Sequence, residues 1–103
     1  MLEGKFRQYL EIERNYSKHT VQAYCSDLSA CRDFLENHYE IDLFKAKDAA
    51  ELSHRMVRVW MGEMLEAGLG NRSVARKVAS LNAYFRYLQK GGFVESNPVA
   101  KVK

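Results

Sequence analysis

The stretch NRSVARKVASLNAYFRYLQKGG, residues 71–92, carries the clearest structural signal in this chain. At about 100° per residue, its apolar side chains converge on one face of a helix. They are Val74, Val78, Leu81, Phe85 and Leu88. Such a stripe is typical of a helix that packs one side against a core. The stretch therefore predicts a helix that ends at about Lys90, before the pair of glycines.

The rest of the chain has the same helical periodicity and a single proline, which predicts an all-α domain. We expect four main helices, and besides residues 71–90 they are Leu2–Arg14, Lys18–His38 and His54–Ala67. Ser17 and Ser53 are suitable N-caps, and Gly68 is a suitable left-handed C-terminal residue. A loop with a short turn is expected over residues 39–52, and Asn97–Pro98 can begin a brief fifth helix.

Two further apolar stripes define the expected core. The helix from Lys18 contributes Val21, Tyr24, Leu28, Cys31 and Leu35, and the helix from His54 contributes Val57, Trp60, Met61, Met64 and Leu65. The first helix has only a short, mixed stripe, formed by Leu2, Phe6, Tyr9, Leu10 and Glu13. Together they predict a compact four- to five-helix bundle.

The 103 residues fit one domain, here taken as residues 1–103. No apolar run approaches the ~20 residues that span a bilayer. The N-terminus has no apolar segment typical of a signal peptide, so a cytoplasmic protein is expected. Cys25 and Cys31 lie at no metal-ligand spacing with the three histidines, so we expect buried thiols and no metal, cofactor or small-molecule ligand.

Positive charge is concentrated in one part of the chain. The net charge is +3, but residues 67–94 hold five Lys or Arg and no acid, so the remainder totals −2. On the polar flank of the helix predicted there lie Arg72, Arg76, Ala79, Ala83, Tyr87 and Lys90, with Ser73, Ser80 and Arg86 beside them. Small residues between long cations would let this helix approach a DNA major groove closely. Because Arg and Ser also bind phosphates, double-stranded DNA is the expected partner.

Other interpretations remain open at this point. A charged helix face is often only solvated, although such faces usually mix both signs. A helical protein-interaction module of the SAM or death-domain type would use charged faces to assemble and would not bind DNA. A stand-alone helix-turn-helix repressor fits poorly because the second helix is long. No nucleophile–base pair or phosphate loop indicates an enzyme.

Two motifs resemble a known family. YSKHTVQAYCSDLSACRDFL (residues 16–35) is similar to the S-x-x-T-x-x-x-Y-x-x-D-L stretch of the N-terminal core-binding domain of tyrosine recombinases, the phage-integrase and Xer-like enzymes. LGNRSVARKVASLNAYFRYLQKGGFVESNPV (residues 69–99) resembles their second signature, a basic helix followed by a Gly turn and Asn-Pro. The resemblance implies a SAM-like bundle that forms half of a clamp around DNA.

In that family the second and fourth main helices face the major groove of a recombination half-site. The matching DNA-contact positions here are Lys18, His19, Thr20, Gln22, Arg72, Ser73, Arg76, Lys77, Ser80 and Arg86. Thr20 could equally serve as a hydrogen-bonding residue of the first turn. Asp27 also matches the motif, and we interpret it as a local structural anchor. The chain departs from the family pattern at three positions. Gly70 provides a weaker cap for the fourth main helix, Cys31 replaces an aromatic residue, and Asn82 replaces an Arg.

The resemblance also implies where the chemistry lies. Tyrosine recombinases form a phosphotyrosyl DNA intermediate with residues of a C-terminal catalytic domain, which this chain does not contain. We therefore expect DNA binding without catalysis, and none of the six tyrosines is assigned as a nucleophile. Other recombinase protomers are expected partners in the parent's synaptic assembly. The thin apolar stripe of the first helix fits a contact surface for them, and it fits a shallow packing helix equally well.

Overall fold

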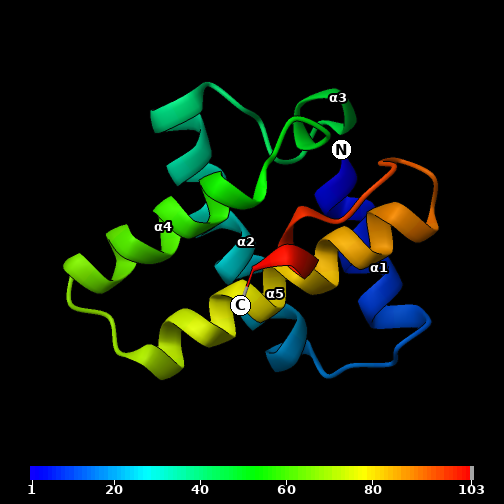
Figure 1. The fold of residues 1–103 in the computed structure, drawn as a ribbon. Helices are drawn as coiled ribbons and strands as arrows, with labels where there is room; N and C mark the ends of the chain where they lie inside the picture. Colours follow the sequence, from blue (N-terminus) through cyan, green and yellow to red (C-terminus); the bar gives the residue numbers. More distant parts are fainter. Residues whose placement is uncertain (103) are drawn as a thin grey trace.

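The protein is an all-α domain in a computed structural model that describes residues 1–102 (Figure 1). Its helices are α1 (Leu2–Ile12), α2 (Lys18–Tyr39), α3 (Ala46–Ala49), α4 (His54–Glu66) and α5 (Asn71–Lys90), followed by the 3-10 helix η1 (Pro98–Lys101). No strand occurs in this part of the chain. The four main helices and the brief last helix are confirmed. The expected turn between residues 39 and 52 is the short helix α3.

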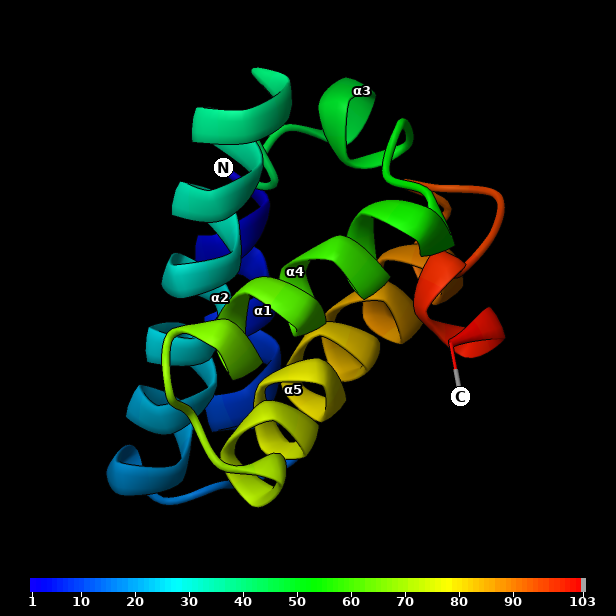
Figure 2. The same cartoon turned by 60° about the vertical axis from the view of Figure 1, so that its left-hand side comes forward.

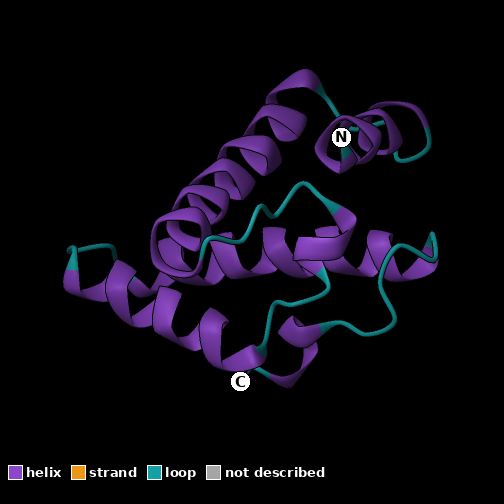
Figure 3. Ribbon diagram, turned by 90° about the horizontal axis from the view of Figure 1, so that it is seen from above, coloured by secondary structure: helices purple, strands orange, loops and turns teal. Residues whose placement is uncertain are grey.

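Helix α5 is the centre of the bundle. It lies between α4 on one side and α2 on the other, and α1 packs against α2 (Figures 1 and 3). The η1 turn folds back onto α4 and α5. Because α5 is packed on two sides, its buried arc is wider than a single apolar stripe. The N-termini of α2 and α5 lie at the same end of the molecule, away from α3 (Figure 2).

Side-chain caps begin three of the helices. The Ser17 hydroxyl accepts the backbone N–H of Thr20, the Ser53 hydroxyl accepts that of Met56, and the Asn97 side chain accepts that of Val99. All three were expected, and each typically stabilises a helix by about 1 kcal/mol. Gly70 occupies the N-cap of α5 without a side-chain hydrogen bond, as its lack of a side chain requires.

Most of the predicted core is confirmed. Leu28, Leu81, Phe85 and Leu88 are completely buried. Cys25 and Cys31 are buried free thiols, and burial raises the pKa of Cys31. Tyr84 was not predicted to be in the core, yet its ring is buried and its hydroxyl donates to the Leu43 carbonyl at 3.0 Å. That bond satisfies a polar group that would otherwise be costly to bury.

Three expectations need correction. Helix α1 ends at Ile12 rather than Arg14, because the chain turns through Asn15 in a left-handed conformation (φ 53°). Leu65 is 46% exposed although its neighbour Met64 is buried, because the two side chains lie about 100° apart around α4 and only Met64 faces the core. Val78, Tyr24 and Met61 are only half-buried, at the edge of the core.

Residues 1–102 contain no group of His, Cys, Asp and Glu side chains arranged to hold a metal ion. No helix in the same range has the length and apolar character needed to cross a membrane.

Candidate nucleic-acid interface

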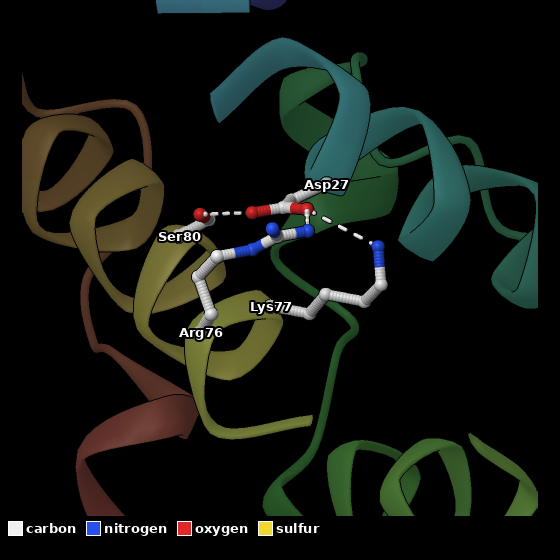
Figure 4. Close-up of polar contacts among 4 residues, drawn as sticks. All are labelled: Asp27, Arg76, Lys77 and Ser80. Carbon is white, nitrogen blue, oxygen red and sulfur yellow. Dashed lines mark hydrogen bonds and ion pairs between the residues drawn. The ribbon is translucent and has the colours of Figure 1, made fainter. Parts of the chain in front are cut away.

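A buried carboxylate joins α2 to α5. Asp27 on α2 is 1% exposed, and three α5 side chains surround it (Figure 4). Arg76 Nη2 lies 2.8 Å and Lys77 Nζ 3.2 Å from Asp27 Oδ1, and Ser80 Oγ donates to Oδ2 at 2.7 Å. Both carboxylate oxygens therefore have donors, which is the condition for burying a charge without a large penalty. We call these four residues the Asp27 cluster.

The carboxylate of this cluster is ionised at neutral pH. Burial by itself raises the pKa of Asp27, but the hydrogen bonds from Ser80, Lys77 and Arg76 favour the charged form and outweigh it. The net result is that the pKa of Asp27 is lowered from its ordinary value. The Asp27 cluster thus carries two positive charges and one negative charge, so the acid-free helix α5 loses one unit of its surplus to its neighbour.

The cluster changes the interpretation of two predicted DNA contacts. Ser80 was placed on the solvent flank of α5, but it is 5% exposed and its hydroxyl is committed to Asp27. The reason is that α2 packs on this side of α5. Lys77 is also partly covered, with 17% of its side chain exposed, whereas Arg76 remains 60% exposed. Arg76 gives one N–H group to Asp27, so the rest of its guanidinium donors stay available.

The remaining predicted residues are exposed. On α2 they are Lys18, His19, Thr20 and Gln22, and on α5 they are Arg72, Ser73 and Arg86. Among residues 1–102, no ion pair includes Lys18, Arg72 or Arg86. The Thr20 hydroxyl accepts a hydrogen bond from Ser17 at 3.0 Å, so it is occupied within the first turn of α2.

The first halves of α2 and α5 form one face. The Asp27 cluster holds the two helices together near their middles, and both N-termini project to the same end (Figures 2 and 4). Neither residues 14–26 nor residues 67–94 contain an acid. The exposed residues near the starts of the two helices include the cations Lys18, Arg72 and Arg76, together with Gln22, Ala23 and Ala79. We call this set of residues the α2–α5 face. Arg86 lies further along α5, beside α1.

The other end of α5 lies against aromatic side chains. Tyr87 was expected on the solvent flank, but it is half-buried, with its ring 4.8 Å from that of Tyr9 and 5.5 Å from that of Phe6. Ala83 is half-buried as well. The exposed flank of α5 is consequently shorter than predicted and is concentrated in its N-terminal half.

Asp27 contacts residues much further along the chain than the sequence predicted. It was expected to be a local anchor, but its partners lie 49 to 53 positions further along the chain. The sequence does contain a signal for a contact between Asp27 and α5. Asp27 borders the buried stripe of its helix, next to Leu28, and α5 carries Arg76, Lys77 and Ser80 within two turns.

Comparison with known proteins identifies the family of this chain. The family described as "Phage integrase, N-terminal SAM-like domain" matches residues 4–92. This chain belongs to that family. The observed all-α fold and both quoted motifs agree with the assignment. No solved structure matches the chain.

Curated relatives of this SAM-like domain are named tyrosine recombinase XerC. The protein from Oceanobacillus iheyensis is 34% identical over 97 residues, covering 94% of this chain and 30% of the relative. The proteins from Syntrophus aciditrophicus and Chlorobaculum tepidum are 32% and 36% identical and cover 95% and 96% of this chain. The chain spans about 30% of the length of these relatives.

Proposed function

We propose that this SAM-like domain binds double-stranded DNA through the α2–α5 face. The observation that carries the proposal is the set of exposed cations itself. Lys18 and Arg72 form no ion pair within residues 1–102, and Arg76 keeps further guanidinium donors beyond the one that binds Asp27. Residues 14–26 and 67–94, which carry these cations, contain no acid. Arg and Lys side chains bind phosphates and release condensed counterions, so a face of this kind favours a polyanion. Ala23 and Ala79 leave room for close approach to a groove.

Within that proposal the residues have different roles. Lys18, Arg72 and Arg76 are the proposed phosphate or base contacts, and His19, Gln22 and Ser73 are polar neighbours on the same face. Arg86 is a proposed contact further along the backbone of the DNA. Thr20 and Lys77 are supporting residues because each already has a partner, and Ser80 is left out because it is buried.

The family assignment extends the proposal to the protein that carries this domain. We infer that this protein is a tyrosine recombinase acting in DNA integration and recombination, with the recombination half-site and other protomers as partners. The phosphotyrosyl chemistry would use residues outside residues 1–103. A DNA substrate and the absence of a membrane-spanning helix among residues 1–102 favour a cytoplasmic location.

The salt dependence of duplex binding tests the proposed face. The wild-type domain should bind non-specifically, with log K falling linearly against log salt between about 50 and 200 mM. Lys18→Gln and Arg72→Gln should each reduce the slope by about one, because each removes one phosphate contact. Lys47→Gln is the control, since Lys47 is an exposed cation on α3 at the opposite end.

Arg76→Glu is not a suitable variant for testing DNA binding. A glutamate there would face the buried Asp27 carboxylate and would disturb the contact between α2 and α5. Slopes that do not change in Lys18→Gln and Arg72→Gln would reject the α2–α5 face. Self-association with no duplex affinity at low salt would instead support the protein-interaction alternative.

A further inference from the structure

A groove beside α1 shares only Arg86 with the residues proposed to contact DNA. It lies between the C-terminal half of α1, the first turns of α2 and the second half of α5, and has a volume of about 370 Å³. This is within the usual size range of ligand-binding clefts, about 300–1,000 Å³. Its elements meet at the side of α5 opposite α4 (Figure 1).

The floor of the groove is apolar and aromatic. Phe6 and Leu10 lie at the bottom and are buried, at 1% and 2% exposure. Half-buried tyrosines form the walls. Tyr9 and Tyr87 are in ring contact at 4.8 Å, and Tyr16 and Tyr24 are stacked at 5.9 Å. Tyrosine walls of this kind supply contact area at a low cost in side-chain entropy.

The charged lining of the groove is entirely positive. Arg14, Arg86 and Lys90 are exposed and line it, and no carboxylate does. Arg14 is held in place, because its Nη2 donates to the Tyr16 hydroxyl at 2.7 Å and its guanidinium lies over the Tyr16 ring. None of the ion pairs within residues 1–102 includes any of these three cations.

This lining discriminates between possible occupants. A duplex is too wide to enter the groove, although it could touch Arg86 at the rim. An unpaired base could stack on the tyrosines and meet Gln89 and the cations. Any polar edge that it turned towards Phe6, Leu10 and Ala83 would lose its hydrogen bonds, which is costly. A flexible protein segment with an apolar side chain between carboxylates suits both features, since the apolar group meets the floor and the carboxylates meet the cations. Tyr and Arg are also the residue types enriched at protein–protein contacts.

We propose that the groove between α1 and α5 binds a short acidic segment of a partner protein, with an apolar side chain of that segment inserted between Tyr9, Tyr24 and Tyr87. Its cations and its aromatic floor carry this inference, which does not depend on the DNA proposal. The groove would let the domain bind a protein partner while the α2–α5 face holds DNA.

The test is an NMR titration of the isotope-labelled domain with three short probe peptides. The first contains Leu and Phe flanked by Asp and Glu, the second replaces the acids with Lys, and the third replaces the apolar residues with Gly. Only the first should shift amide signals along the groove, in residues 9–16 and 83–90. Binding of the Lys peptide with equal affinity, or no shift with the acidic apolar peptide, would overturn the proposal.

A charge-matched pair of variants locates the contact. Arg14→Glu/Lys90→Glu should weaken the acidic apolar peptide at least tenfold, while Lys47→Glu/Arg58→Glu should not, because those exposed cations lie on α3 and α4. If both double variants bound the acidic apolar peptide with equal affinity, the groove would not be its binding site. Groove signals that depend on protein concentration without peptide would show a second copy as the occupant, and would also overturn the assignment of an acidic partner.

Discussion

Asp27→Ala should destabilise the domain by about 3 kcal/mol, because it removes the acceptor of three donors and leaves a partly buried lysine without a counter-charge. For a domain of this size, the melting temperature should fall by roughly 10 to 20 °C. Thermal unfolding followed by circular dichroism measures the change. The loss of unfolding free energy should be larger than for typical surface substitutions, since this carboxylate is 1% exposed.

Glu36→Ala is the control for that result. Glu36 also belongs to α2 and pairs with Arg32 at 3.7 Å, but both side chains are exposed. Such surface pairs contribute about 0–1 kcal/mol. If Asp27→Ala were no more destabilising than Glu36→Ala, the Asp27 cluster would not be what holds α2 against α5.

The same carboxylate gives stability a defined pH dependence. Because the pKa of Asp27 is lowered in the folded protein, its contribution is fully present above the unfolded-state pKa, about 3.9, and is lost as the pH falls through the folded-state pKa. The difference in unfolding free energy between wild type and Asp27→Asn should be constant from about pH 5 upwards and shrink below about pH 4. Denaturant unfolding at several pH values would show this. A constant difference down to low pH would contradict the ionised cluster.

Charge reversal at both helices of the α2–α5 face should nearly abolish duplex binding. Lys18→Glu/Arg72→Glu changes the net charge from +3 to −1. Losing two phosphate contacts at about 0.1 M salt lowers affinity about 60-fold by counterion release alone, and the new repulsion brings the expected loss to at least about 100-fold. Fluorescence anisotropy with a labelled duplex measures it.

Lys47→Glu/Arg55→Glu separates position from total charge. Lys47 on α3 and Arg55 at the start of α4 are exposed, so this double variant has the same net charge of −1 with the α2–α5 face intact. Its affinity should stay within a few-fold of wild type. An equal loss in both double variants would mean that overall charge, rather than this face, governs binding.

The fold could be predicted from the sequence because local signals agree with one another. Ser17, Ser53 and Asn97 begin helices where capping chemistry requires it, and the apolar stripe of α5 faces the core. The apolar periodicity of a helix does not show which other helices will pack against it. Tyr84 and Ser80 lie outside the predicted stripe, yet both are buried because α5 is packed on two sides.

The candidate site was predictable to a similar degree. The acid-free segments indicate an anionic partner from charge alone, so Lys18 and Arg72 could be named in advance, and both are exposed in the structure. The position of Asp27 beside a buried stripe indicates an inward-facing carboxylate, but periodicity does not show which residues of another helix will bind it, so its ion pairs with Arg76 and Lys77 were not predicted. The groove beside α1 was not predicted either, since it depends on how Tyr9, Tyr24 and Tyr87 meet across three helices.

The most direct measurement of the central claim is a map of amide chemical shifts on adding duplex DNA at low salt. Binding through the α2–α5 face predicts the largest changes in residues 17–26 and 71–80, with little change in α3 or the outer side of α4. Changes concentrated on α3 and α4, or no change with duplex in large excess at low salt, would contradict it.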